Sequence, residues 1–338
     1  MKITLLRIVL LSVAVTVIAC DRDKDAKVAA QNQSAIAPAD TPASKLSLPP
    51  DTGSKPAIDG ARAMQYVKEI VAFGPRPIGS ANHKKVEDYL LAHLKGDEVE
   101  NDTFTADTPE GKFPVHNIIA KFPGTKDGII VVASHYDTNY PFRNTSYVGA
   151  NDGGSSSALL LELANQLRGK KRDGYSVWLV WDDAEEAIKP DTEVPFLSDS
   201  LYGIRHLAEK WEADGTLKKI KAFLLADMIG DADLNIDRDG NSTPWLEEVV
   251  YEAATRLGYQ SHFFARTLPG VDDDHIPFVK RGVPSADLID FNYGYNDVLW
   301  HTTQDTVDKL SPKSLEIVGK TILETIGILD KMDPLPPK

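Results

Sequence analysis

The chain alternates between short apolar runs and segments in which apolar residues recur at helical spacing. Ile129–Ser134 and Tyr175–Trp181 are nearly unbroken apolar runs, a pattern typical of strands buried on both faces of a sheet. Ala61–Phe73 places its apolar residues every three or four positions and is followed by Gly74-Pro75, which predicts a helix with a defined end. The same criteria predict further helices at residues 83–94, 155–167, 200–211, 243–257 and 312–331, and further strands at 99–104, 115–122, 220–226 and 285–289.

Strands and helices therefore alternate along most of the chain. This order is typical of α/β domains whose strands are joined through helices. The 338 residues and 42% hydrophobic content are enough for one large domain or two small ones. We predict a single doubly wound α/β domain over residues 58–338, with a largely parallel central sheet flanked by helices.

The N-terminus has a different pattern. Two basic residues precede an apolar run from Ile8 to Ile18, as in a signal peptide. Val17-Ile18-Ala19-Cys20 then resembles the lipobox of bacterial lipoproteins, with the only cysteine of the chain at the position that is lipidated. We predict a signal peptide at residues 1–19 and a lipid anchor at Cys20, which would hold the protein on a membrane of a bacterial cell envelope, facing the periplasm. The alternative is an ordinary secretory signal with an incidental cysteine.

Composition and charge narrow the function. Residues 20–57 are rich in Ala, Asp, Lys, Ser, Pro and Gln without apolar periodicity, which predicts a flexible tether behind the lipid. The formal net charge of −13 makes nucleic acid a poor partner. Once Cys20 is lipidated no thiol remains, so a disulfide and a cysteine nucleophile are both excluded.

Acidic residues and histidines recur at the ends of the apolar runs or shortly after them. Zinc takes nitrogen and oxygen ligands from His, Asp and Glu, and a catalytic zinc site keeps one position open. Open α/β sheets build their sites at the carboxyl ends of the strands, so we expect these side chains to meet there. The candidate ligands are His135, Asp152, Glu186, Asp227 and His301.

Glu185 stands directly before the candidate ligand Glu186. Neighbouring residues point in different directions, so one carboxylate can bind metal while the other acts as a general acid/base beside it. Any one of these acids alone is more often a solvated surface residue. Their combination at several strand ends predicts a metal site.

Six short motifs carry these residues and their neighbours: Ser-His-Tyr-Asp at 134–137, Gly-Ala-Asn-Asp-Gly-Gly at 149–154, Trp-Asp-Asp-Ala-Glu-Glu-Ala at 181–187, Leu-Leu-Ala-Asp-Met-Ile-Gly at 224–230, Asp-Asp-His-Ile-Pro-Phe at 273–278 and Trp-His-Thr at 300–302. They resemble the M28 family of zinc aminopeptidases and their relatives, the animal-type glutaminyl-peptide cyclotransferases. The resemblance extends from about Ala61 to Ile328, and it implies the zinc-aminopeptidase fold.

The two branches imply different sites. In the peptidases, two zinc ions are held by the counterparts of all five candidate ligands, and Glu185 would activate a water molecule. In the cyclotransferases, one zinc ion is held by the counterparts of Asp152, Glu186 and His301. The resemblance then implies that Glu185 shuttles protons, that Asp227 and Asp273 form a carboxylate pair, and that Trp300 binds substrate.

Four features favour the cyclotransferase branch: Asp273, Trp300, and the segments 199–208 and 274–284, both of which closely resemble cyclotransferase segments. Asp273 stands where the peptidases usually have a serine, and Trp300 directly precedes the ligand His301. Against it, residues 188–197 lack the tryptophan that the cyclotransferases carry after the Glu-Glu pair, and Phe196 is a hypothetical replacement. Thr302–Thr306 resembles both branches equally.

We therefore predict a zinc-dependent enzyme that converts the N-terminal glutamine of peptides or proteins to pyroglutamate and releases ammonia. The alternative is a two-zinc aminopeptidase, in which His135 and Asp227 would hold the second ion. A third hypothesis, a metal-dependent binding lipoprotein without catalysis, is disfavoured because Glu185 is retained beside the ligands.

Overall fold

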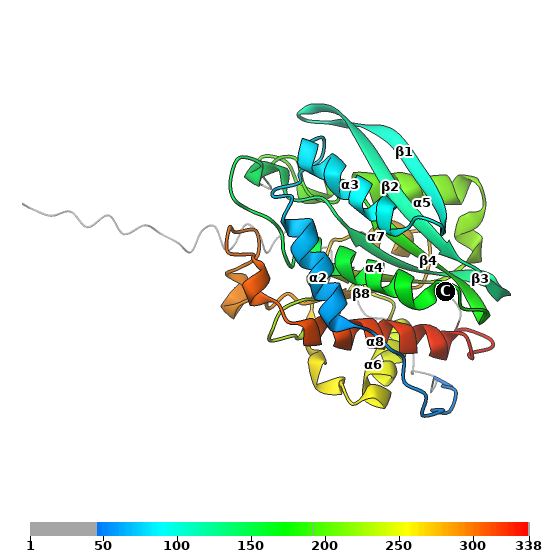
Figure 1. Ribbon diagram of the computed structural model, residues 1–338. Coiled ribbons are helices and arrows are strands. Elements are labelled where there is room, and N and C mark those ends of the chain that lie inside the picture. Colours follow the sequence, from blue (N-terminus) through cyan, green and yellow to red (C-terminus); the bar gives the residue numbers. More distant parts are fainter. Residues whose placement is uncertain (1–45, 191, 337–338) are drawn as a thin grey trace, which may run out of the picture. The chain divides into compact units, whose positions relative to one another are not determined.

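The computed structural model describes residues 46–190 and 192–336 (Figure 1). The predicted signal peptide at residues 1–19, the predicted anchor Cys20 and the first part of the predicted tether, up to residue 45, lie outside the described residues. Within the described part of the chain, no helix has the length and apolar character that crossing a membrane requires.

A six-stranded sheet forms the centre of the fold, in the order β1-β2-β4-β3-β5-β8. The section β4-β3-β5-β8 is parallel, whereas β1 pairs antiparallel with β2 and β2 antiparallel with β4. Only two residues connect β1 to β2, and a connection of that length permits nothing but an antiparallel hairpin. The strands are β1 (Glu98–Thr108), β2 (Gly111–Phe122), β3 (Gly124–His135), β4 (Arg172–Asp182), β5 (Ile220–Asp227) and β8 (Ser285–Ile289).

Helices cover both faces of this sheet, which confirms the predicted α/β fold (Figure 1). On one face α2, α4, α6 and α8 pack together, and on the other face α5 and the short α7 lie against the strands. The helices are α2 (Gly60–Val71), α3 (Ala81–His93), α4 (Gly154–Leu167), α5 (Tyr202–Ala213), α6 (Pro244–Leu257), α7 (Ile276–Val279) and α8 (Pro312–Leu329).

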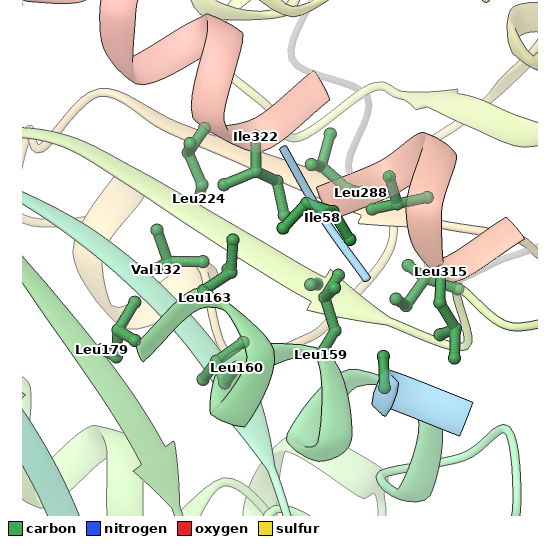
Figure 2. Close-up of a cluster of buried hydrophobic side chains, with 14 of the residues drawn as sticks. Ile58, Val132, Leu159, Leu160, Leu163, Leu179, Leu224, Leu288, Leu315 and Ile322 are labelled. Carbon is green, nitrogen blue, oxygen red and sulfur yellow. The ribbon is translucent and has the colours of Figure 1, made fainter. Parts of the chain in front are cut away.

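The unbroken apolar run of β3 follows from burial on both faces. Ile130 and Val132 point into the core under α4 and α8, whereas Val131 and Ala133 point into the core under α5. Figure 2 shows the first of these cores, where the strand residues Val132 and Leu224 lie near Leu163 of α4 and Ile322 of α8. Two packed faces hold the strands, and therefore their carboxyl ends, in fixed positions.

A small second sheet and the segment at residues 46–49 also belong to the folded domain. A second, two-stranded parallel sheet pairs β6 (Ile236–Asp239) with β7 (Phe263–Leu268), neither of which the sequence pattern predicted. At the other end of the chain, Leu46 and Leu48 pack against the main core, and the Arg256 guanidinium donates a hydrogen bond to the carbonyl of Pro49. Residues 46–49 of the predicted tether therefore contact the folded body.

Candidate metal centre and active site

The parallel strands bring the predicted ligands to one edge of the sheet. β3 ends at His135 and β5 ends at Asp227, while Asp152 lies in the turn that leads into α4. The Nε2 atom of His135 lies 3.2 Å from Asp152 Oδ1 and 3.3 Å from Asp227 Oδ1. These three side chains form one group of potential metal ligands, with their donor atoms within 4.8 Å of one another.

A second group shares Asp152 with the first. The Nε2 atom of His301 lies 3.3 Å from Asp152 Oδ2 and 3.3 Å from Glu186 Oε2. One oxygen of Asp152 thus faces each histidine, which is the arrangement of a carboxylate that can bridge two sites. All five predicted ligands are therefore brought together.

The donor set fits zinc. It contains imidazole nitrogen and carboxylate oxygen atoms that converge, and the Oε1 atom of Glu186 is buried without a hydrogen-bond partner among the described residues. Buried polar atoms are nearly always paired, so a cation is the natural partner for these converging donors. Burial lowers the pKa of both His135 and His301, but the surrounding carboxylates outweigh burial and hold each pKa well above its usual value.

Glu185 lies beside both groups and belongs to neither. Its Oε2 atom is 3.9 Å from His135 Nδ1. Burial and the nearby carboxylates of Glu186 and Asp273 raise the pKa of Glu185 well above its usual value. A cation bound at Glu186 would lower that pKa again, because it replaces a repulsive charge with an attractive one. Glu185 is thus placed to exchange a proton next to a metal ion.

Asp137 holds the backbone of the two glutamates. Its carboxylate accepts hydrogen bonds from the backbone N–H groups of Glu185 (3.2 Å) and Glu186 (3.3 Å). The side chain of Asn139 donates to Glu186 Oε2 at 2.7 Å. These contacts hold the backbone of the Glu-Glu pair and the carboxylate of Glu186 in place.

Three residues at the site have a left-handed backbone. Ala184 precedes the Glu-Glu pair, Met228 follows Asp227, and His301 is itself a predicted ligand; their φ angles are 58°, 47° and 51°. This conformation costs roughly 1–3 kcal/mol for a residue other than glycine and persists only where the surroundings impose it. Its recurrence beside the ligands is consistent with a site that is held in one geometry for function.

Asp273, Trp300 and Glu185 line the same chamber as four of the predicted ligands, Asp152, Glu186, Asp227 and His301. Asp273 is buried, and burial together with the charge of Asp227 raises its pKa well above the usual value. The Trp300 ring stacks on the His301 ring at 4.2 Å between centroids. Phe196, the hypothetical replacement for the missing tryptophan, also lines this chamber. The structure therefore places the predicted site residues that it describes around one chamber, except for His135, which lies behind the chamber wall and contacts Asp152 and Asp227.

Comparison with known proteins identifies the family. The model of peptidase family M28 matches residues 117–326, more than half of the chain. The chain belongs to peptidase family M28. It is 32% identical over 257 residues to the glutaminyl-peptide cyclotransferase of Drosophila melanogaster, which covers 68% of this chain and 70% of the relative. The resemblance seen in the sequence is confirmed.

Two solved structures are similar to this chain over most of its length. The glutaminyl cyclase of an Acidobacteriales bacterium has 48% sequence identity and a TM-score of 0.79, covering 85% of this chain and 99% of that one. A Zn-dependent exopeptidase from Parabacteroides distasonis has 27% identity and a TM-score of 0.72, covering 81% of this chain and 99% of that one. The scaffold is thus shared by proteins named for both activities.

Sequence reasoning missed the residue that ties the M28 ligand loops together. Arg76 is fully buried, and its guanidinium donates to the carbonyls of Tyr136 (2.7 Å), Gly149 (2.9 Å) and Asp152 (3.2 Å). These carbonyls belong to the loop after β3 and to the turn before α4, which carry the ligands His135 and Asp152. The Gly74-Pro75 pair before Arg76 indicates only a helix end, so the role of Arg76 becomes visible in the fold alone.

Two further residues fix the turn that carries Asp152. Asp305 accepts hydrogen bonds from the backbone N–H groups of Asn151 (2.8 Å) and Asp152 (3.2 Å), and burial raises its pKa to about 7. Gly153 has a φ of 68°, and a Cβ atom there would lie only 2.7 Å from Cε1 of His135. A glycine in this position could have been suspected from the Asp-Gly-Gly string, since such strings favour tight turns.

Proposed function

We propose that this M28 protein is a zinc-dependent glutaminyl-peptide cyclotransferase, which converts N-terminal glutamine to pyroglutamate and releases ammonia. The observation that carries the proposal is the position of Asp273. Its side chain lines the chamber together with Asp227, Glu185 and Trp300, and the charge of Asp227 helps to raise its pKa. The relative from Drosophila melanogaster and the Acidobacteriales protein, both named for this activity, support it.

The chain's own residues account for the reaction. The substrate α-amine attacks the carbon of its own side-chain carboxamide, a C–N bond forms, and the bond to the amide nitrogen breaks. Glu185 takes the proton from the attacking amine and delivers it to the leaving nitrogen, so ammonia departs. A zinc ion held by Asp152, Glu186 and His301 would polarise the carboxamide oxygen as a Lewis acid. The nucleophile is already part of the substrate, so orientation supplies much of the remaining rate.

Asp273, Asp227 and Trp300 orient the substrate in this proposal. Burial and the charge of Asp227 raise the pKa of Asp273, and the two carboxyl groups can hold the α-amine or the leaving nitrogen. Trp300 offers an apolar wall to the glutamine methylene groups. The second ligand group, His135 with Asp152 and Asp227, is the observation that favours the aminopeptidase alternative, because it could hold a second zinc ion.

Zinc titration separates these alternatives. Protein stripped by a chelator is expected to lose activity toward a Gln-initiated peptide and to recover all of it at one equivalent of zinc. Ammonia release and bound zinc are measured at each addition. A His135→Asn variant serves as control, because a one-zinc enzyme should still bind one equivalent. Recovery that requires two equivalents, and a drop to one in the variant, would favour the aminopeptidase.

We also propose that Cys20 anchors the protein in a bacterial cell envelope, facing the periplasm. The lipobox-like Val17–Cys20 string and the apolar run before it support this proposal. Cys20→Ala protein is expected to leave the membrane fraction, whereas the unaltered chain stays in it until detergent is added. Recovery of both proteins in the soluble fraction would contradict the anchor.

A further inference from the structure

An open cleft adjoins the metal chamber. Its volume is about 730 Å³, and it shares the walls Phe196, Asp272 and Trp300 with the chamber. If glutamine occupies the chamber, as the proposed function requires, the residues that follow it in the peptide must leave through this cleft. The side chains that line the cleft therefore meet the second and third residues of the substrate.

Apolar groups make up most of the cleft, including Phe142, Pro190 and Leu268. Its two basic side chains already have partners. Arg266 donates two hydrogen bonds to Asp237, at 2.8 and 2.6 Å, and Lys189 forms an ion pair with Glu110. Neither cation has its charge free for a substrate.

The two acidic residues of the cleft, Asp297 and Asp272, are not both paired in this way. Asp297 accepts a hydrogen bond from the backbone N–H of Tyr293 at 3.1 Å. Asp272 is exposed, directly precedes Asp273, and forms no ion pair or side-chain hydrogen bond within the described residues 46–190 and 192–336. The charge that remains for a peptide in this cleft is therefore negative, in a chain whose net charge is −13.

We propose that Asp272 selects peptides with a lysine or arginine in the first two positions after the glutamine. A basic side chain fits this cleft through both its apolar stem and its charged end. Its methylene stem packs on the apolar wall, and its charged end reaches the free carboxylate of Asp272. An acidic side chain in the same place would meet Asp272 with like charge. The selection rests on the proposed function, since it places the glutamine in the metal chamber.

The test compares three peptides that differ only at the second residue: Gln-Lys, Gln-Leu and Gln-Glu. At low salt, kcat/KM is expected to be about two- to fivefold higher for Gln-Lys than for Gln-Leu, and lowest for Gln-Glu. The expected difference is small because an ion pair exposed to solvent contributes little free energy. At about 0.5 M salt the differences should largely disappear, because screening is then strong. A Gln-Lys preference that persists at high salt would contradict a role for charge.

Asp272→Asn is expected to abolish the ratio of Gln-Lys to Gln-Glu rates, and Asp272→Lys to reverse it. Asp127→Asn is the matched control, because Asp127 is exposed and lies near the start of β3, at the end of the strand opposite to the site. The control changes the net charge equally and should keep the ratio. Equal ratios in the Asp272→Asn protein and in the control would overturn the inference.

Binding of the corresponding pyroglutamyl-Lys and pyroglutamyl-Glu peptides, measured by calorimetry, separates this inference from the proposed function. If no Gln-initiated peptide is converted, the proposed function fails, and the binding preference still decides the role of Asp272. Tighter binding of the Lys peptide that is lost in Asp272→Asn supports the inference. Equal binding of both peptides refutes it.

Discussion

Replacing Glu185 with glutamine is expected to lower kcat by about 10²–10⁴-fold while the protein still binds zinc with unchanged stoichiometry. Glu185 lies in neither group of potential ligands, yet it lines the chamber with them. The amide of glutamine has nearly the same shape as the carboxylate but cannot accept a proton, so only proton transfer is removed. Steady-state kinetics and metal analysis on the same preparation measure both effects.

Glu186→Gln is the matched control, because it makes the same chemical change one residue further on. Glu186 Oε2 faces His301 Nε2 at 3.3 Å, so this variant is expected to lose zinc affinity as well as activity. If Glu185→Gln were the variant that loses zinc, the roles of the two glutamates would have to be exchanged.

The second large effect is expected at Asp273. Asp273→Ala should lower the rate of cyclisation by about 10²-fold without unfolding the protein. Its carboxyl group is buried, and burial together with the charge of Asp227 raises its pKa, so ionised Asp273 does not stabilise the fold at neutral pH. Removing the Asp273 carboxyl group is therefore expected to disturb the orientation of the substrate and to leave the stability of the fold intact. Cyclisation kinetics and thermal unfolding of the variant measure these two quantities.

Asp273→Asn serves as a second variant, because it keeps the side-chain volume and an oxygen that can accept the hydrogen bond from the Asp274 N–H (2.6 Å). It is expected to be nearly as inactive as Asp273→Ala and at least as stable as the unaltered protein. Near-normal cyclisation in both variants would remove the main structural argument for the cyclotransferase over the aminopeptidase.

The sequence pattern predicted the parts of the fold that are dictated by local burial. β8 begins and ends at the predicted residues, and the predicted buried strands lie within β3 and β4. β6 and β7 were missed because they are short, and because β7 is largely exposed and lacks a clear alternation. The antiparallel hairpin of β1 and β2 was not specified either, since strand direction depends on pairing partners rather than on the apolar pattern.

The site was predictable because its position follows from the buried strands. Ligands that follow buried strands must meet where parallel strands end, and His135 and Asp227 are the last residues of β3 and β5. Arg76 could not be predicted, because its partners are backbone carbonyls far along the chain, with which no sequence spacing associates it. The number of zinc ions stays a prediction for a similar reason: Asp152 faces both histidines, so the same side chains suit one ion or two.

Mass spectrometry of a Gln-initiated peptide after incubation with the purified protein and zinc tests the central claim most directly. A glutaminyl-peptide cyclotransferase leaves the peptide chain intact and lowers its mass by about 17 Da, the mass of ammonia, at a rate that depends on Glu185. Loss of a whole glutamine residue, about 128 Da, together with free glutamine in solution, would contradict the account and establish the aminopeptidase instead.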